Sequence, residues 1–281
     1  EQSAADFSPE ALLAQGYDLD IGRCISQAWE AYKNNFWTYF GAFWLAMVAV
    51  IVGGAFLGGL LGGIGAILAP EAMKHPAGRA VLDFIVSVTV PVLSGPIMAG
   101  LYLFYLKNLR GQAASLGEIF SLFQRNFKAA YLGQLLISVI AFLCMLTFNF
   151  KCNGVILPLL DQMKTATPEQ VQSIMHQITA EFMSLVPVLL LSAVPLTYFI
   201  VSLVFTLPLV ADKPLSFGSA VSLGWKLVHR HWFQIFGLTV LGGLISMVGI
   251  LGCVVGVVVT LPLGTLILVQ GYEAIVNAAK K

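Results

Sequence analysis

The sequence feature that most constrains the fold is a long apolar run without a charged side chain, which extends from Phe36 to Leu68. A helix needs about 20 consecutive apolar residues to cross the hydrocarbon core of a bilayer. The run is long enough for one such helix with room for tilt. We therefore expect it to be the first transmembrane helix.

The composition agrees with a membrane protein. Of the 281 residues, 58% are hydrophobic and only 10% are charged, whereas a soluble domain carries roughly 25% charged residues. So few charges cannot cover a surface that faces water. The net charge is +1 and no basic cluster lies outside the membrane flanks, so we predict no nucleic-acid partner.

Further apolar segments predict five more spans. They cover about 84–106, 131–150 and 183–210, and a tight hairpin within the stretch from Phe233 to Val269 that turns near Val255–Val259. The second and fourth spans contain prolines: Pro91, Pro96, Pro187, Pro195 and Pro208. A proline kinks a membrane helix and frees backbone carbonyls, which neighbouring groups must satisfy.

The amphipathic stretch that precedes the first apolar run recurs before the last one. Leu19–Gly41 reads LDIGRCISQAWEAYKNNFWTYFG and Leu215–Gly237 reads LSFGSAVSLGWKLVHRHWFQIFG. Apolar residues at steps of three and four lie on one helix face in both copies. Ser115–Lys128 has the same apolar phase with weaker identity. In addition, Thr89-Val90-Pro91 precedes Gly100 by the spacing that separates Thr260-Leu261-Pro262 from Gly271.

These patterns predict an all-α integral membrane protein with six transmembrane helices, built from three repeats of an interfacial amphipathic helix plus a transmembrane hairpin. Residues 1–18 are expected to be a polar arm or linker, and residues 19–281 the membrane domain. The repeats cover about 19–110, 112–213 and 215–281. The second contains an extramembrane insertion at 151–182, in which Thr167-Pro168-Glu169-Gln170 starts a helix that lies on the membrane surface or against the bundle.

The distribution of basic residues predicts the orientation. Eleven of the 15 Lys and Arg side chains fall on one side of the predicted spans and four on the other. This excess places both termini and the repeat helices in the cytoplasm, in a bacterial inner membrane. The basic faces would meet anionic lipid headgroups. Four tryptophans are the expected interfacial anchors, and the first and third of them are expected to be buried where helix meets hairpin: Trp29, Trp37, Trp225 and Trp232.

Glycines in the first and fifth predicted spans recur at spacings that allow two helices to approach closely in lipid. They are Gly54, Gly58 and Gly62 in the first span, and Gly249, Gly252 and Gly256 in the fifth. We expect both strips to face close helix neighbours. The neighbour is either another helix of this chain or a second subunit.

Few ionisable residues fall in the predicted spans. Asp83 lies at the edge of the second, and Glu273, near the end of the sixth, is expected to be an interfacial carboxylate near Lys280. Coupled transporters usually need buried carboxylates or histidines.

We predict no catalytic, cofactor-binding or metal-binding residues. The cysteines have no paired spacing and are expected to be buried thiols: Cys24, Cys144, Cys152 and Cys253.

The stretch LDIGRCISQAWEAYKNNFW with its glycine-rich span resembles bacterial multi-pass membrane proteins of unknown function, and so does PLVADKPLSFGSAVSLGWKLVHRHW with the final hairpin. These are similar to the membrane domain attached to some glycerophosphodiester phosphodiesterases. The resemblance covers most of Leu19–Tyr272 and implies the same membrane fold. The soluble phosphodiesterase domain is absent from the chain, so that activity is not implied.

The expected function is a non-enzymatic membrane scaffold, or an accessory subunit of a larger membrane complex. Its partners would be membrane lipids and other membrane protein subunits. The proline kinks and the interfacial helices favour an alternative, a carrier or lateral gate for lipid or another apolar molecule. An enzyme is the third possibility and lacks any recognisable catalytic constellation.

Overall fold

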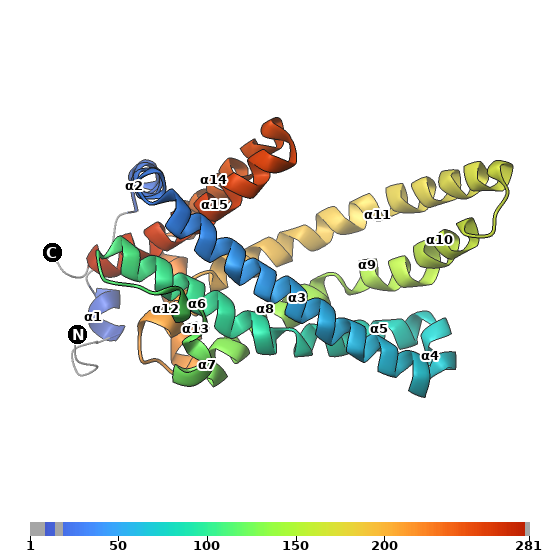
Figure 1. Ribbon diagram of the computed structural model, residues 1–281, viewed down its shortest axis with the longest axis horizontal. Coiled ribbons are helices and arrows are strands. Elements are labelled where there is room, and N and C mark those ends of the chain that lie inside the picture. The colour runs from blue at the N-terminus through green and yellow to red at the C-terminus, as the bar shows by residue number, and fades with distance from the viewer. Residues whose placement is uncertain (1–8, 15–18, 279–281) are drawn as a thin grey trace. The chain divides into compact units, whose positions relative to one another are not determined.

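A computed structural model describes residues 9–14 and 19–278 (Figure 1). Within these ranges every regular element is helical, which confirms the all-α fold. Five helices are long and apolar enough to cross a membrane: Phe36–Leu68, Ala77–Leu109, Phe127–Cys144, Pro168–Asp212 and Gly256–Val276. A sixth is added if Phe217–Arg230 and Trp232–Val248, which are bent by 96° relative to each other, count together as one span.

The chain divides into two compact units. Unit 1 contains the chain up to Val52, Val92–Gln134 and the chain from Ile200 onward, and unit 2 contains Gly53–Pro91 and Leu135–Phe199. Long helices contribute to both, since α3 (Phe36–Leu68) gives its first half to unit 1 and its second half to unit 2.

Unit 1 holds most of the buried apolar side chains. Besides the start of α3, its helices are α1 (Pro9–Ala14), α2 (Ile21–Asn34), α6 (Pro91–Leu109), α7 (Leu122–Arg125), the start of α8 (Phe127–Cys144), α12 (Thr206–Asp212), α13 (Phe217–Arg230), α14 (Trp232–Val248) and α15 (Cys253–Ala278). The last two lie side by side as a hairpin (Figure 1). Helices α6 and α15 are the most buried spans, and α2 packs on α15.

Helices α2 and α13 have matching ends. Each has 14 residues, and each begins after a residue whose side chain accepts from the backbone N–H three positions on, Asp20 in α2 and Ser216 in α13. Such caps satisfy one of the free N–H groups at a helix start. Each helix ends at a residue with φ and ψ of −133° and 44° (Asn35) or −137° and 44° (His231). The next helix starts immediately afterwards.

The stretch Ser115–Lys128 differs from the expected amphipathic helix. It forms a 3₁₀ helix, η2 (Leu116–Phe120), followed by the single turn of α7. The Ser121 backbone N–H and hydroxyl both donate to the Glu118 carbonyl, which favours the tighter 3₁₀ turn. Helix α7 nevertheless ends in the same backbone conformation as α2 and α13, since Asn126 directly after it has φ −148° and ψ 47°.

Pro262 lies inside α15, and a side chain of another helix satisfies the carbonyl that it leaves without its helical partner. Pro262 has no N–H for the Val258 carbonyl four residues before it. The Trp44 indole donates to that carbonyl at 2.9 Å, and the Tyr32 hydroxyl donates to the next one, of Val259, at 2.7 Å. Side chains of α3 and α2 therefore bond α15 directly before its proline.

The final hairpin turns earlier than expected. The turn is the 3₁₀ helix η4 (Gly249–Gly252), not Val255–Val259. Gly249 and Gly256 meet there so closely that a Cβ on either would overlap the backbone of the other. Glycine permits this approach, whereas the valines continue the helix.

The N-terminal arm is structured in part. Pro9–Ala14 forms α1, which packs on α13, and Leu12 is buried in the core of unit 1. The prediction of a polar arm or linker is therefore wrong for these residues. Residues 1–8 and 15–18 lie outside the described ranges.

Unit 2 contains the second half of α3, α4 (Pro70–Lys74), α5 (Pro76–Thr89), the end of α8, α9 (Leu146–Lys151), a π-helical turn η3 (Cys152–Ile156), α10 (Leu157–Met163) and most of α11 (Pro168–Leu203). The Asn153 amide donates to the Asp83 carboxylate at 2.7 Å. Asp83, at the edge of a predicted span, thus has a polar partner within its unit.

The stretch between the first two predicted spans is mostly helical, since it forms α4 and the start of α5. One expectation for unit 2 is wrong. The surface helix expected at 168–182 is not separate, because α11 runs without a break from Pro168 to Leu203. Its start is as predicted, since the Gln170 side chain accepts from the Thr167 N–H at 2.9 Å. No residue between Phe182 and Pro187 interrupts the helix, so the polar and apolar parts merge.

Candidate functional site

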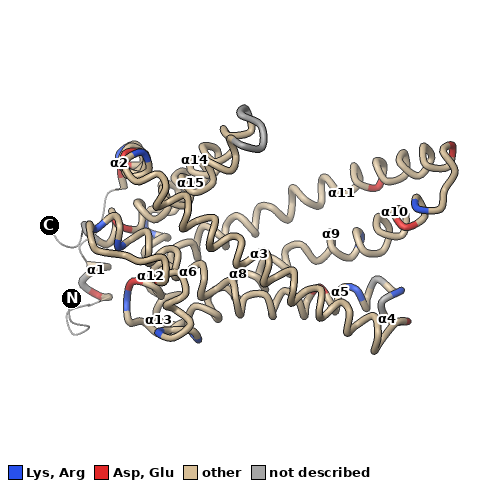
Figure 2. Tube along the Cα trace, in the orientation of Figure 1, with Lys and Arg blue, Asp and Glu red and all other residues tan. Residues whose placement is uncertain are grey.

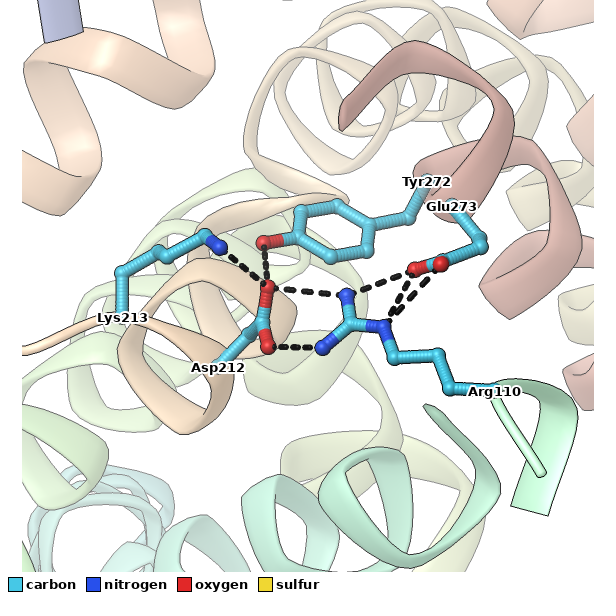
Figure 3. A network of polar contacts seen from close by, with 5 residues as sticks. All are labelled: Arg110, Asp212, Lys213, Tyr272 and Glu273. Carbon is cyan, nitrogen blue, oxygen red and sulfur yellow. Dashed lines mark hydrogen bonds and ion pairs between the residues drawn. The ribbon is translucent and has the colours of Figure 1, made fainter. Parts of the chain in front are cut away.

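The most concentrated polar chemistry in the described residues is a buried ion cluster in unit 1 (Figure 3). It joins the ends of three helices: Arg110 follows α6, Asp212 ends α12 with Lys213 directly after it, and Tyr272 and Glu273 lie on α15. We call these five residues the ion cluster.

Local sequence explains where the arginine and the aspartate lie. Gly111 has φ 67°, a left-handed conformation that glycine adopts readily, and it ends α6 directly after Arg110. The Gln112 N–H closes this end by donating to the Lys107 carbonyl at 2.9 Å. Pro214 ends α12 in a similar way, because the residue before a proline disfavours helical geometry. Lys213 is accordingly extended.

The Arg110 guanidinium bridges two carboxylates. Its Nη1 and Nη2 donate to the two oxygens of Asp212 at 2.5 and 3.1 Å. On its other edge, Nε donates to both oxygens of Glu273 at 3.0 Å and Nη2 donates to Oε2 at 2.6 Å. A planar guanidinium is the side chain best suited to such two-sided bidentate pairing.

Two further groups complete the cluster. The Tyr272 hydroxyl donates to Asp212 Oδ2 at 3.1 Å, and the Lys213 ammonium lies 3.2 Å from the same oxygen. Two positive and two negative side chains therefore meet with a net charge of zero. The side chains of Asp212 and Glu273 are only 5% and 9% exposed, and that of Arg110 is 20% exposed.

Electrostatics hold the arginine in its charged form. Burial alone would lower the pKa of the Arg110 guanidinium, but the hydrogen bonds and charges of Asp212 and Glu273 outweigh burial and raise it above its ordinary value. The guanidinium thus carries a fixed charge between two acceptors. This arrangement favours a clamp between helices over an acid–base catalyst.

A second ion pair extends the polar contacts along α6. Lys107, one turn before Arg110, contacts Glu118 of η2 at 2.6 Å, and Arg125 approaches the same carboxylate at 4.0 Å. The end of α6 is therefore tied by charge to η2 and α7 as well as to α12 and α15.

Sequence reasoning missed this cluster. Glu273 is buried and pairs with Arg110, a partner that the expectation of an interfacial carboxylate near Lys280 did not include. Lys280 lies outside the described residues. One signal was available: Arg110, Asp212 and Glu273 lie near the ends of the second, fourth and sixth predicted spans, on the same predicted side. Opposite charges at one membrane level are candidates for pairing.

The tryptophans are less buried than expected. Trp29 and Trp37 are exposed, and Trp225 and Trp232 are half-buried. The prediction that Trp29 is buried at its helix junction is therefore wrong. The buried positions are the preceding ones, Ala28 in α2 and Gly224 in α13. Small residues there let each helix approach its neighbours.

The glycine strips have different surroundings. A Cβ on Gly58 or Gly62 would have no atom of the described residues within 4 Å, and one on Gly54 would meet only a Val90 methyl. The seam of the first span therefore has no close helix neighbour within the described chain at these two positions. The strip in the fifth span agrees better with the expectation of a close neighbour, because Gly249 and Gly256 contact each other. Gly252 lies in a stretch whose side chains are not described.

Other glycines of unit 1 also make close contacts with neighbouring elements. A Cβ on Gly95 or Gly100 of α6 would overlap backbone atoms of Ala130 or Ile119, and one on Gly271 would overlap the Leu238 side chain. These positions allow α6 and α15 to be buried. Gly100 and Gly271 are the two glycines matched in the sequence by spacing from a Thr-x-Pro triplet.

Three of the cysteines can be located. Cys24 is buried, which confirms its prediction and raises the pKa of its thiol, and Cys144 and Cys152 are half-buried. Cys253 is on α15 in a stretch whose side chains are not described. Among the described residues, no group of three His, Cys, Asp or Glu side chains is arranged to hold a metal ion.

Comparison with protein-family models, with curated proteins and with solved structures found no match to this chain.

Proposed function

We propose that the protein is a non-enzymatic integral membrane scaffold or an accessory subunit of a larger membrane complex. The observation that carries this proposal is the open glycine face of α3. Cβ atoms on Gly58, Gly59, Gly62 and Gly63 would meet no described atom within 4 Å. In lipid, helices associate by close packing over small residues, because apolar burial gives little drive. A glycine face that is turned to lipid gains no helix packing, whereas a partner helix could pack closely against it.

Within this proposal, the chain has six spans arranged as three repeats. The matching caps and lengths of α2 and α13 support the repeat. So do the breaks at Asn35, Asn126 and His231, which share one backbone conformation. Helix α14, with 17 residues, is the fifth span and α15 the sixth. As part of the same proposal, the chain shares the membrane fold of the domain that is attached to some glycerophosphodiester phosphodiesterases.

We further propose that both termini face the cytoplasm of a bacterial cell. The excess of Lys and Arg on one side of the predicted spans supports this orientation. In each unit most charges lie at helix ends, at connections or on the shorter helices, and the long helices carry few (Figure 2). In unit 1 they lie around α2, the end of α6 and the α12–α13 connection, and in unit 2 around α4 and the α10–α11 connection.

Single-cysteine labelling tests the orientation. In a variant without the native cysteines, Lys164→Cys should react with a membrane-impermeant maleimide in intact cells, and Glu30→Cys only after permeabilisation. Both positions are exposed, so access is limited only by the membrane. Labelling of the two positions from the same side would contradict the six-span arrangement.

Purification from native membranes, followed by quantitative mass spectrometry, tests the scaffold role. We expect protein partners in stoichiometric amounts, and we expect Gly58→Leu/Gly62→Leu to lose them because leucine side chains would fill the open face. Gly243→Leu is the matched control, since Gly243 is an exposed glycine of α14 with nothing near its Cβ. Stoichiometric lipid without a protein partner would favour the carrier or gate instead.

A further inference from the structure

The exposed face of α13 carries positive charge without negative charge. Ser222, Lys226 and Arg230 are exposed along it, and no Asp or Glu occurs between Phe217 and Arg230. Neither Lys226 nor Arg230 has a carboxylate of the described residues within 4.0 Å. The charge of this face is therefore not neutralised within the described part of the chain.

Helix α2 has the same length and caps but a balanced face. Its exposed charges are Arg23 and Lys33, together with Asp20 at the cap and Glu30. They sum to zero. The Lys33 ammonium also lies 5.8 Å from the centre of the Trp29 ring, within cation–π range. The two helices thus differ in charge while they agree in geometry.

The bend after α13 places its end at a defined depth. Helix α14 starts at Trp232, directly after the break at His231, and meets α13 at 96°. If α14 crosses the bilayer, α13 lies in the plane of the membrane surface. Phe233 is 81% exposed and apolar, which suits the acyl region just below the headgroups. Arg230, three residues earlier, then lies at headgroup depth.

We propose that the exposed face of α13 binds anionic phospholipid headgroups of the leaflet that α14 enters, through Lys226 and Arg230. Charge complementarity identifies this occupant. A guanidinium pairs with phosphate through two parallel hydrogen bonds, a lysine adds a point charge one turn away, and the Ser222 hydroxyl offers another donor. The proposal rests on α14 crossing a membrane and does not depend on the scaffold role.

Position within the helix gives a competing explanation for one of the two residues. Arg230 lies in the last turn of α13, where a positive charge also interacts favourably with the helix dipole. That effect acts on the stability of the protein without lipid. The response to added lipid is therefore the measurement that separates the two explanations.

The experiment uses the full-length protein in a neutral detergent, titrated with phosphatidylglycerol or with phosphatidylcholine in mixed micelles, and records the melting temperature. A ligand that binds only the folded state raises the melting temperature with its concentration. We expect phosphatidylglycerol to do so and phosphatidylcholine to have little effect. Each basic side chain near an anionic surface contributes about 5-fold in affinity, so Lys226→Gln/Arg230→Gln should shift the midpoint of the titration by about 30-fold.

The matched control is Arg23→Gln/Lys33→Gln on α2, which should keep the wild-type response to phosphatidylglycerol. Added salt should weaken the response of the wild type, because the contact is electrostatic. The proposal is overturned if phosphatidylcholine stabilises equally, if inorganic phosphate reproduces the effect, if the α2 variant loses the response as well, or if the α13 variant retains it.

Discussion

Arg110→Met is expected to lower the melting temperature of the detergent-purified protein by on the order of 10 °C. Removal of one partner from a buried ion pair costs about 3–5 kcal/mol, because the other charge stays buried without compensation. In this cluster two carboxylates, those of Asp212 and Glu273, lose their shared guanidinium at once. One kcal/mol corresponds to roughly 2–4 °C in a protein of this size. Thermal unfolding followed by tryptophan fluorescence measures the change.

A second variant distinguishes an ion clamp from ordinary packing. Arg110→Met/Glu273→Gln removes one positive and one negative charge, and leaves Asp212 with Lys213 at 3.2 Å and with the Tyr272 hydroxyl. The remaining charges balance, so this double variant should melt at a higher temperature than Arg110→Met alone. If the double variant is instead the less stable of the two, charge compensation is not what the arginine provides.

Gly100→Ala should destabilise the purified protein, while Gly58→Ala should leave its stability unchanged or raise it slightly. A Cβ on Gly100 would overlap the Ile119 carbonyl, and backbone atoms cannot move aside as a flexible side chain can. Overpacking of this kind costs about 1–3 kcal/mol, sometimes more. A Cβ on Gly58 meets open space, so the substitution gains up to about 1 kcal/mol from the higher helix propensity of alanine.

Gly271→Ala serves as an intermediate case in the same unfolding experiment. Its Cβ would overlap only a Leu238 methyl, at the far end of a side chain that can adopt another rotamer. We expect its melting temperature to lie between those of the other two variants. Equal effects at Gly100 and Gly58 would mean that α6 does not pack against η2 as closely as described.

Local signals predicted well what depends on local physics. Apolar runs predicted six spans, and five helices of the described chain are long and apolar enough to be such spans, because the length of a transmembrane helix is set by bilayer thickness. The capping residues around Thr167 predicted the start of α11 correctly. The local signals did not predict correctly where one helix ends and the next begins. Without a strong breaker after Phe182, the sequence could not tell a polar helix followed by a span from one continuous helix.

The contacts between distant residues could not be predicted in the same way. Arg110 and Glu273 are 163 positions apart, and nothing in either local sequence names the partner. The glycines raise a similar difficulty. The spacing at Gly54, Gly58 and Gly62 is regular, yet a Cβ on Gly58 or Gly62 would meet open space, whereas one on Gly95 or Gly100 would overlap the backbone of a neighbouring element. Spacing describes which residues share a face, while the neighbour of that face is fixed by tertiary packing.

The ion cluster has a consequence for biosynthesis. Its members leave the ribosome at three different times, and Glu273, from α15, is the last. At a synthesis rate of about 5–20 residues per second, the 163 positions between Arg110 and Glu273 take roughly 8–30 s to translate. During that interval Asp212 is the only one of its two carboxylate partners that Arg110 can meet. The cluster is therefore completed only when α15, the last helix of the chain's described part, has been synthesised.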